Sequence, residues 1–137
     1  MKVGRARAAL TLLWGAGSSP VFITIVYMTV MDRFGTAWET PWTWISPLLF
    51  PILGLIIMAV TAGKSANDDK EVKSSHVFWF TLILSMTYLA TIYVIIFMQP
   101  FSKLPLERSM QISGWYLGPL QGLVTAALGK FFVENID

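Results

Sequence analysis

The placement of charged residues most constrains what this 137-residue chain can fold into. The charges fall into five short clusters, and four long apolar intervals between them carry none: approximately residues 8–31, 43–63, 76–98 and 113–129. An α-helix needs roughly 20 apolar residues to cross the hydrocarbon of a bilayer. The pattern therefore predicts an all-α, polytopic integral membrane protein in which four transmembrane helices form a single domain over residues 1–137.

Composition excludes several other classes of protein. Only 13% of the residues are charged and 55% are apolar, whereas a soluble domain carries about 25% charged residues. The formal net charge of +2 is too small to indicate direct binding to nucleic acid. The chain has no cysteine, which excludes disulfides and thiolate metal sites.

Lysine and arginine are unevenly divided between the two sides of the predicted bundle. The amino terminus, the loop 64–75 and Lys130 hold seven of the ten basic residues. Because positive charge is retained on the cytoplasmic side, we expect both termini and this loop in the cytoplasm. Loops 32–42 and 99–112 are then external, and the expected location is the bacterial inner membrane.

The amino-terminal stretch "MKVGRARAALTLLWGAGSS" also has the basic start and short apolar run of a secretory signal peptide. The apolar run resumes after Pro20 and reaches membrane length at Met31. We therefore expect the segment to be retained as the first span. Its "GAGSSP" stretch indicates a tightly packed helix with a kink, and the alternative is a broken helix whose freed backbone groups bind an ion or substrate.

The second span carries Pro47, Pro51 and Gly54 on one helical stripe that continues to Met58 and Thr61. Proline leaves a helical carbonyl without its usual donor, and such carbonyls in membranes are satisfied by neighbouring protein or by water. We therefore expect this stripe to face protein rather than lipid.

The last span, in "GWYLGPLQGLVTAALGK", combines membrane-like hydropathy with small and polar residues. Plotted on a helix, the small and polar residues share an arc of roughly 140°. The members of this arc are Gly114, Gly118, Gly122, Ala126, Gln121, Thr125 and Gly129. Small residues let membrane helices approach closely. The arc is therefore predicted to be a helix-packing or oligomer interface.

Hydroxyl groups give the third span a polar side. The candidates for the lining of a pore are Thr81, Ser85, Tyr88 and Thr91 of this face, or alternatively Gln121 and Thr125 of the last span. Ser and Thr in membrane helices can instead bond to a neighbouring helix or back to their own carbonyls. Packing between helices is the favoured interpretation of the hydroxyl face, and pore lining is the alternative.

Two further sets of residues are typical of membrane surfaces. Aromatic side chains suited to the headgroup region are Trp38, Trp42, Trp44 and Trp115. Cations that could contact lipid headgroups or a cytoplasmic protein are Arg5, Arg7, Lys64, Lys70 and Lys73.

Chemical motifs are missing from the sequence. No Asp, Glu, Lys or Arg lies inside a span, and no catalytic set, metal site or cofactor site can be assembled from spaced residues. We expect neither enzymatic activity nor a cofactor. The sequence favours a homo-oligomeric membrane subunit or anchor of a larger complex, such as a bacterial defence or immunity module. The alternatives are a weakly selective ion channel and an immunity protein against a membrane-active toxin.

Overall fold

The structure is a computed structural model that describes residues 1–61 and 69–135. Its four long helices are α1 (Val3–Val30), α2 (Glu39–Thr61), α3 (Ser75–Phe97) and α4 (Leu106–Glu134). Two short 3-10 turns, η1 (Gly35–Ala37) and η2 (Gln99–Phe101), precede α2 and α4. Lys64, one of the candidate cytoplasmic contacts, lies outside the described residues.

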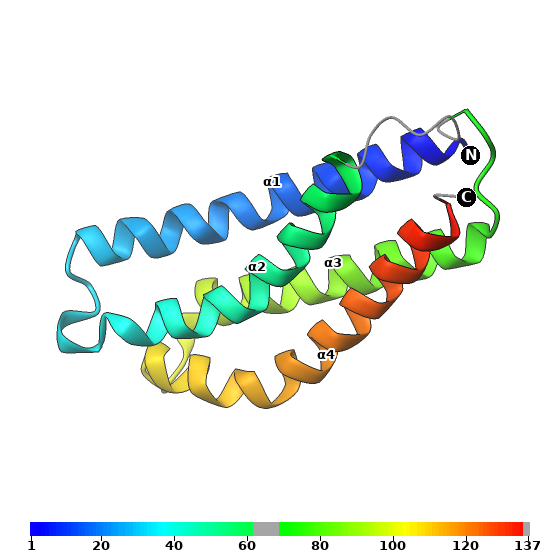
Figure 1. The fold of residues 1–137 in the computed structure, drawn as a ribbon. Coiled ribbons are helices and arrows are strands. Elements are labelled where there is room, and N and C mark those ends of the chain that lie inside the picture. The colour runs from blue at the N-terminus through cyan, green and yellow to red at the C-terminus, as the bar shows by residue number, and fades with distance from the viewer. Residues whose placement is uncertain (62–68, 136–137) are drawn as a thin grey trace.

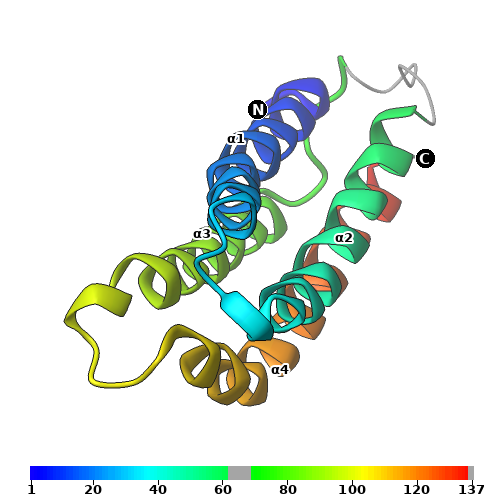
Figure 2. The same ribbon diagram turned by 90° about the vertical axis from the view of Figure 1, so that its left-hand side faces the viewer.

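The helices form an up-down-up-down bundle (Figure 1). α1 and α3 run in one direction, α2 and α4 run in the other, and both termini lie at the same end. α4 packs against α3 and α2, and α1 packs against the same two helices. The second view shows α1 and α4 on opposite sides of the bundle (Figure 2).

α1 is one uninterrupted helix, although it contains Pro20. The small residues before the proline stay helical, and the hydroxyls of Ser18 and Ser19 bond back to the carbonyls of Trp14 and Gly15. This back-bonding satisfies the serine hydroxyls within the helix. The alternative of a broken first helix is therefore wrong for this fold.

Three helices begin several residues earlier than the charge pattern indicates, and the first of them, α1, starts at Val3 rather than at residue 8. α2 starts at Glu39, inside the predicted external loop 32–42. α4 starts at Leu106, directly after Pro105, and continues without a break to Glu134. Its first turns bury Leu106 and Met110, so this part of the predicted loop 99–112 belongs to α4 itself.

The centre of the bundle is filled by large side chains. Trp14, Tyr88 and Phe131 are fully buried, and the Trp14 and Tyr88 rings lie 5.9 Å apart between centroids. Aromatic rings at such separations add to the stability that their buried area provides. The interior of the described bundle is therefore packed with side chains rather than hollow.

Many other large apolar side chains point outward. Leu12, Ile23, Ile57, Phe80 and Leu123 are all more than half exposed on the bundle surface. Apolar exposure on this scale marks a surface that meets lipid or protein. Three helical segments, Val3–Val30, Gly35–Thr61 and Ser75–Phe97, are long and apolar enough to cross a membrane. The structure thus shows an all-helical protein with three such candidate spans, whereas the sequence predicts four.

Candidate functional site

The glycines of α4 lie on the outside of the bundle. Gly114, Gly118 and Gly122 are exposed, and a Cβ atom placed at any of them would meet nothing within 4 Å. Ala126 continues the same exposed row. We call these four residues the glycine ridge. The described chain packs α4 through other residues, among them Leu117, and leaves the glycine ridge uncovered.

The polar members of the same arc lie differently. Gln121 and Thr125 are half-buried, as is Gly129 at the end of the arc. The side-chain amide of Gln121 donates a hydrogen bond across to the carbonyl of Pro47 in α2. The arc predicted as one interface is thus divided: Gln121 joins α4 to α2, and the glycine ridge beside it faces outward.

The proline stripe of α2 also faces outward, contrary to expectation. Pro47, Pro51, Met58 and Thr61 are exposed, with Met58 at 73% exposure, and Gly54 is half-buried. The proline stripe does not have to be buried as a whole. A side-chain donor from α4, Gln121, reaches the carbonyl of Pro47 while the rest of the stripe stays exposed. Since Gln121 binds Pro47, this stripe lies next to the glycine ridge on the bundle surface.

Three side-chain donors of α3 and α4 bond to backbone carbonyls of α1 and α2. Besides Gln121, the hydroxyl of Tyr88 donates to the carbonyl of Leu48, at 3.0 Å, and that of Tyr93 donates to the carbonyl of Gly17, at 2.8 Å. Both acceptors lie within one turn of a proline in their helices, Gly17 before Pro20 and Leu48 after Pro47. Of the three acceptors, only the Pro47 carbonyl is one that a proline frees, because Pro51 lies four residues after it, and such carbonyls in membrane helices are satisfied by neighbouring helices.

The hydroxyl face of α3 is largely inside the bundle. Thr81, Ser85 and Tyr88 are fully buried, and Thr91 is half-buried with its hydroxyl bonded to the carbonyl of Thr87. Thr81 donates to the carbonyl of Val77, at 2.7 Å, and lies 3.3 Å from that of Ala127 in α4. Within one chain these side chains fill the space between helices and do not surround an open path.

The four predicted interfacial tryptophans fall into two pairs. Trp38 is exposed, and Trp115 is 86% exposed, as expected for residues that contact lipid headgroups. Trp42 and Trp44 are held by the bundle: their indole N–H groups donate to Thr29 Oγ1, at 3.1 Å, and to Ser113 Oγ, at 2.8 Å. The sequence gives no sign of these two partners.

The amino terminus, the segment before α3 and the carboxyl end of α4 are joined at one end of the bundle. Met1 and Val3 exchange backbone hydrogen bonds with Val72 and Lys70, each 3.0 Å long. Lys2 Nζ lies 2.9 Å from Asp69 Oδ1. This hydrogen bond and the lysine charge lower the pKa of the Asp69 carboxyl below its ordinary value.

Arg7 does not lie on the surface as its sequence position suggests. It is 9% exposed, and its guanidinium donates to the backbone carbonyl of Asn135 over 3.2 Å. The Asn135 side chain bonds in turn to Phe131 and to the backbone N–H of Lys73. Arg5, Lys70 and Lys73 are exposed and remain accessible to a lipid headgroup or to another protein.

No family model, curated protein or solved structure matches this chain. The class that its own features define is an all-helical membrane protein, because three of its helices are long and apolar enough to cross a bilayer.

Proposed function

We propose that this protein crosses the bacterial inner membrane four times and acts as a homo-oligomeric, membrane-embedded subunit or anchor of a larger complex. The observation that carries the proposal is the glycine ridge on α4. Its three glycines face outward with open space where side chains would be. In hydrocarbon, helices associate through close contact between such small residues.

The proposal treats α4 as the fourth span. Residues 109–129 carry no charged side chain, and charged residues stand on both sides of this segment: Glu107 and Arg108 before it, Lys130 and Glu134 after it. α4 also lies alongside α2 and α3 in the bundle (Figure 1). An even number of spans places the two neighbouring termini on one side, and the excess of lysine and arginine there favours the cytoplasm.

The joined ends of the chain support a role as an anchor. The hydrogen bonds of Asn135 and Arg7 hold the start of α1, the start of α3 and the end of α4 together. Arg5, Lys70 and Lys73 are exposed at this joined end of the bundle. A cytoplasmic protein with an acidic surface is the partner that such an arrangement favours.

The ion-channel alternative requires a path between subunits, because Trp14, Tyr88 and Phe131 fill the described interior of one chain. Gln121 and Thr125 are half-buried and share the helical arc of the glycine ridge, so they would supply polar groups to a path formed along it. Ion flux through liposomes containing the purified protein favours this alternative, and electrically silent bilayers favour the anchor.

The mass of the purified protein in detergent tests the assembly. Gly118→Leu places a branched side chain in the centre of the glycine ridge, so we expect the oligomer to dissociate to the monomer. Gly15→Leu is a matched control, because Gly15 is also exposed with nothing within 4 Å of its Cβ position but lies on α1. Unchanged mass in Gly118→Leu would overturn the proposed interface.

Purification from the native host tests the role as a subunit. We expect a soluble protein to copurify with the wild-type chain and to be lost when Arg5, Lys70 and Lys73 are all replaced by glutamine. Recovery of the oligomer alone would count against an anchor.

A further inference from the structure

α3 and α4 leave a groove of about 430 Å³ on the outer surface of the bundle, at the end that carries both termini. This volume falls within the range of about 300–1,000 Å³ that is typical of small-molecule sites. Phe80 and Leu123 form apolar walls, and the small side chains of Ala126 and Ala127 leave the space between them open. We call this the α3–α4 groove.

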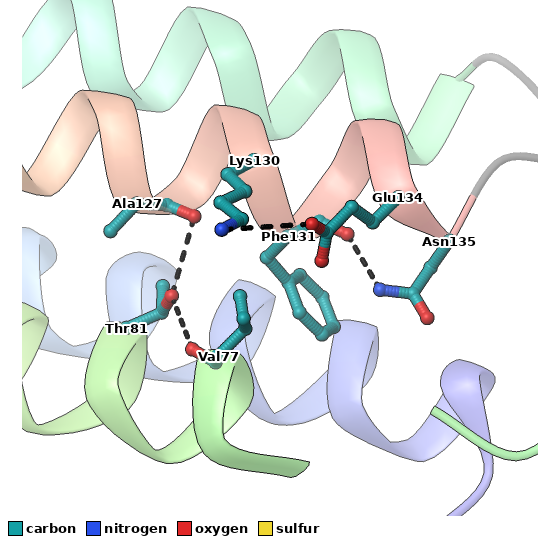
Figure 3. Close-up of polar contacts among 7 residues, drawn as sticks. All are labelled: Val77, Thr81, Ala127, Lys130, Phe131, Glu134 and Asn135. Atoms are coloured by element: carbon teal, nitrogen blue, oxygen red, sulfur yellow. Dashed lines mark hydrogen bonds and ion pairs between the residues drawn. The ribbon is translucent and has the colours of Figure 1, made fainter. Parts of the chain in front are cut away.

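The floor of the α3–α4 groove is apolar in character because its polar atoms are already bonded. The Thr81 hydroxyl donates to the carbonyl of Val77, at 2.7 Å, and lies 3.3 Å from the carbonyl of Ala127 (Figure 3). These contacts also fix α3 against α4 at this depth. A ligand in the groove would therefore meet mainly hydrocarbon surface.

The ionisable side chains of the lining, those of His76 and Lys130, stand at the end of the groove near the termini. His76 is the second residue of α3, and Phe80 lies one turn deeper; Lys130 lies near the end of α4, and Leu123 lies two turns deeper. At a helical rise of 1.5 Å per residue, the apolar walls lie about 6–10 Å below the polar end. A phospholipid has the same order of parts along the membrane normal, with a charged headgroup above an acyl chain.

We propose that the α3–α4 groove binds an anionic phospholipid, with an acyl chain between Phe80 and Leu123 and the phosphate beside Lys130 and His76. The ammonium group of Lys130 supplies the charge complementary to the phosphate. Glu134, one turn along α4, opposes it: its Oε1 lies 3.7 Å from Lys130 Nζ (Figure 3). An exposed pair at this spacing is weak, so a phosphate competes with it for the lysine.

This inference rests on the proposed placement of α4 in the membrane, but not on the proposed assembly. The groove adjoins the glycine ridge, because Ala126 belongs to both, whereas Gly118 and Gly122 are not among the residues that line the groove. The two proposals still have separate readouts, because Gly118→Leu is measured by the mass of the oligomer and Lys130→Gln by the retention of lipid.

Native mass spectrometry of the full chain in detergent, with added phosphatidylglycerol or phosphatidylcholine of the same acyl chains, tests the site. We expect the wild type to retain phosphatidylglycerol in preference to phosphatidylcholine. Lys130→Gln should weaken phosphatidylglycerol binding about fivefold, the effect of one cation near a lipid headgroup. Glu134→Gln should strengthen it about twofold, because it releases the lysine. Lys103→Gln, exposed at the opposite end, is the matched control and should leave binding unchanged.

The apolar part of the groove has its own test. Leu123→Ala removes a wall and should weaken both lipids alike, whereas Leu12→Ala, a similarly exposed leucine on α1, should not. Equal retention of the two lipids, or no response to Lys130→Gln and Glu134→Gln, overturns the proposal. Loss of oligomer mass in Leu123→Ala with unchanged lipid binding also overturns it, because the occupant is then a second copy of the chain.

Discussion

The side-chain amide of Gln121 in α4 donates a hydrogen bond to the backbone carbonyl of Pro47 in α2. In an α-helix this carbonyl accepts from the N–H four residues later. That residue is Pro51, which has no N–H. The glutamine therefore replaces a hydrogen bond that Pro51 removes. It joins α4 to α2 at a position where α2 lacks one of its own backbone hydrogen bonds.

Replacing this donor should destabilise the bundle. Gln121→Met keeps the length of the side chain but leaves the Pro47 carbonyl without the amide. We expect the free energy of unfolding to fall by about 1 kcal/mol, within the range measured for hydrogen bonds between membrane helices. Reversible unfolding by sodium dodecyl sulfate in mixed micelles measures the change.

The Pro51→Ala background supplies the control for Gln121→Met. Alanine restores the N–H that normally serves the Pro47 carbonyl, so the loss caused by Gln121→Met should shrink in this background. Coupling of this kind is what a double-mutant cycle isolates. Equal losses in both backgrounds would mean that the carbonyl of Pro47 is not the partner through which Gln121 stabilises the fold.

Two glycines of α1 provide a second prediction. A Cβ atom at Gly17 would lie 2.8 Å from Leu89 Cδ1 of α3, whereas a Cβ at Gly15 meets nothing within 4 Å. We expect Gly17→Ala to be less stable than Gly15→Ala by about 1 kcal/mol, because the end of the leucine must move to admit the methyl group. Thermal unfolding in one detergent compares the two, and the difference should disappear in a Leu89→Ala background.

The sequence was sufficient to predict the positions of the helices because the feature that defines them is local. Charged residues are excluded from hydrocarbon, so the charge-free intervals coincide with the centres of α1 to α4. The ends were less well predicted. Leu106 and Met110 extend α4 into the expected loop because α4 buries them against the bundle, and that burial depends on the rest of the fold.

The candidate site was only partly readable for a similar reason. The helical period correctly places Gly114, Gly118 and Gly122 on one face, but it does not say which way that face turns. Gln121 lies at the edge of the same arc and yet contacts Pro47, because the contact depends on how α4 is aligned against α2. Whether the glycine ridge is an oligomer interface stays a prediction.

Arg7 leads to a third prediction. Its guanidinium is buried and donates to the carbonyl of Asn135, so Arg7→Met keeps much of the packing and removes the charged donor. Hydrogen bonds to charged groups contribute about 1.5–3 kcal/mol, and we expect a loss at the lower end of this range. Hydrogen exchange should quicken at the carboxyl end of α4.

The exposed Arg5 is the matched control for this substitution. Arg5→Met should alter stability by less than about 0.5 kcal/mol, as is usual for surface positions. Equal effects of Arg5→Met and Arg7→Met on exchange would contradict a specific contact between Arg7 and the carboxyl end.

The ion pair of Lys2 and Asp69 gives a prediction about pH. The hydrogen bond and the charge of Lys2 lower the pKa of Asp69, so the unfolded chain binds the proton more tightly than the folded one. The stabilising contribution of the ion pair is therefore present above the ordinary carboxyl pKa of about 3.9 and is lost as the pH falls through the lower pKa of the folded state.

Lys2→Ala should return the Asp69 pKa toward the ordinary value, as measured by NMR titration of its carboxyl carbon. Both groups are exposed, so 1 M salt should reduce the shift of the Asp69 pKa in the wild type by screening the charges. A pKa shift that survives both Lys2→Ala and high salt would have to come from another group.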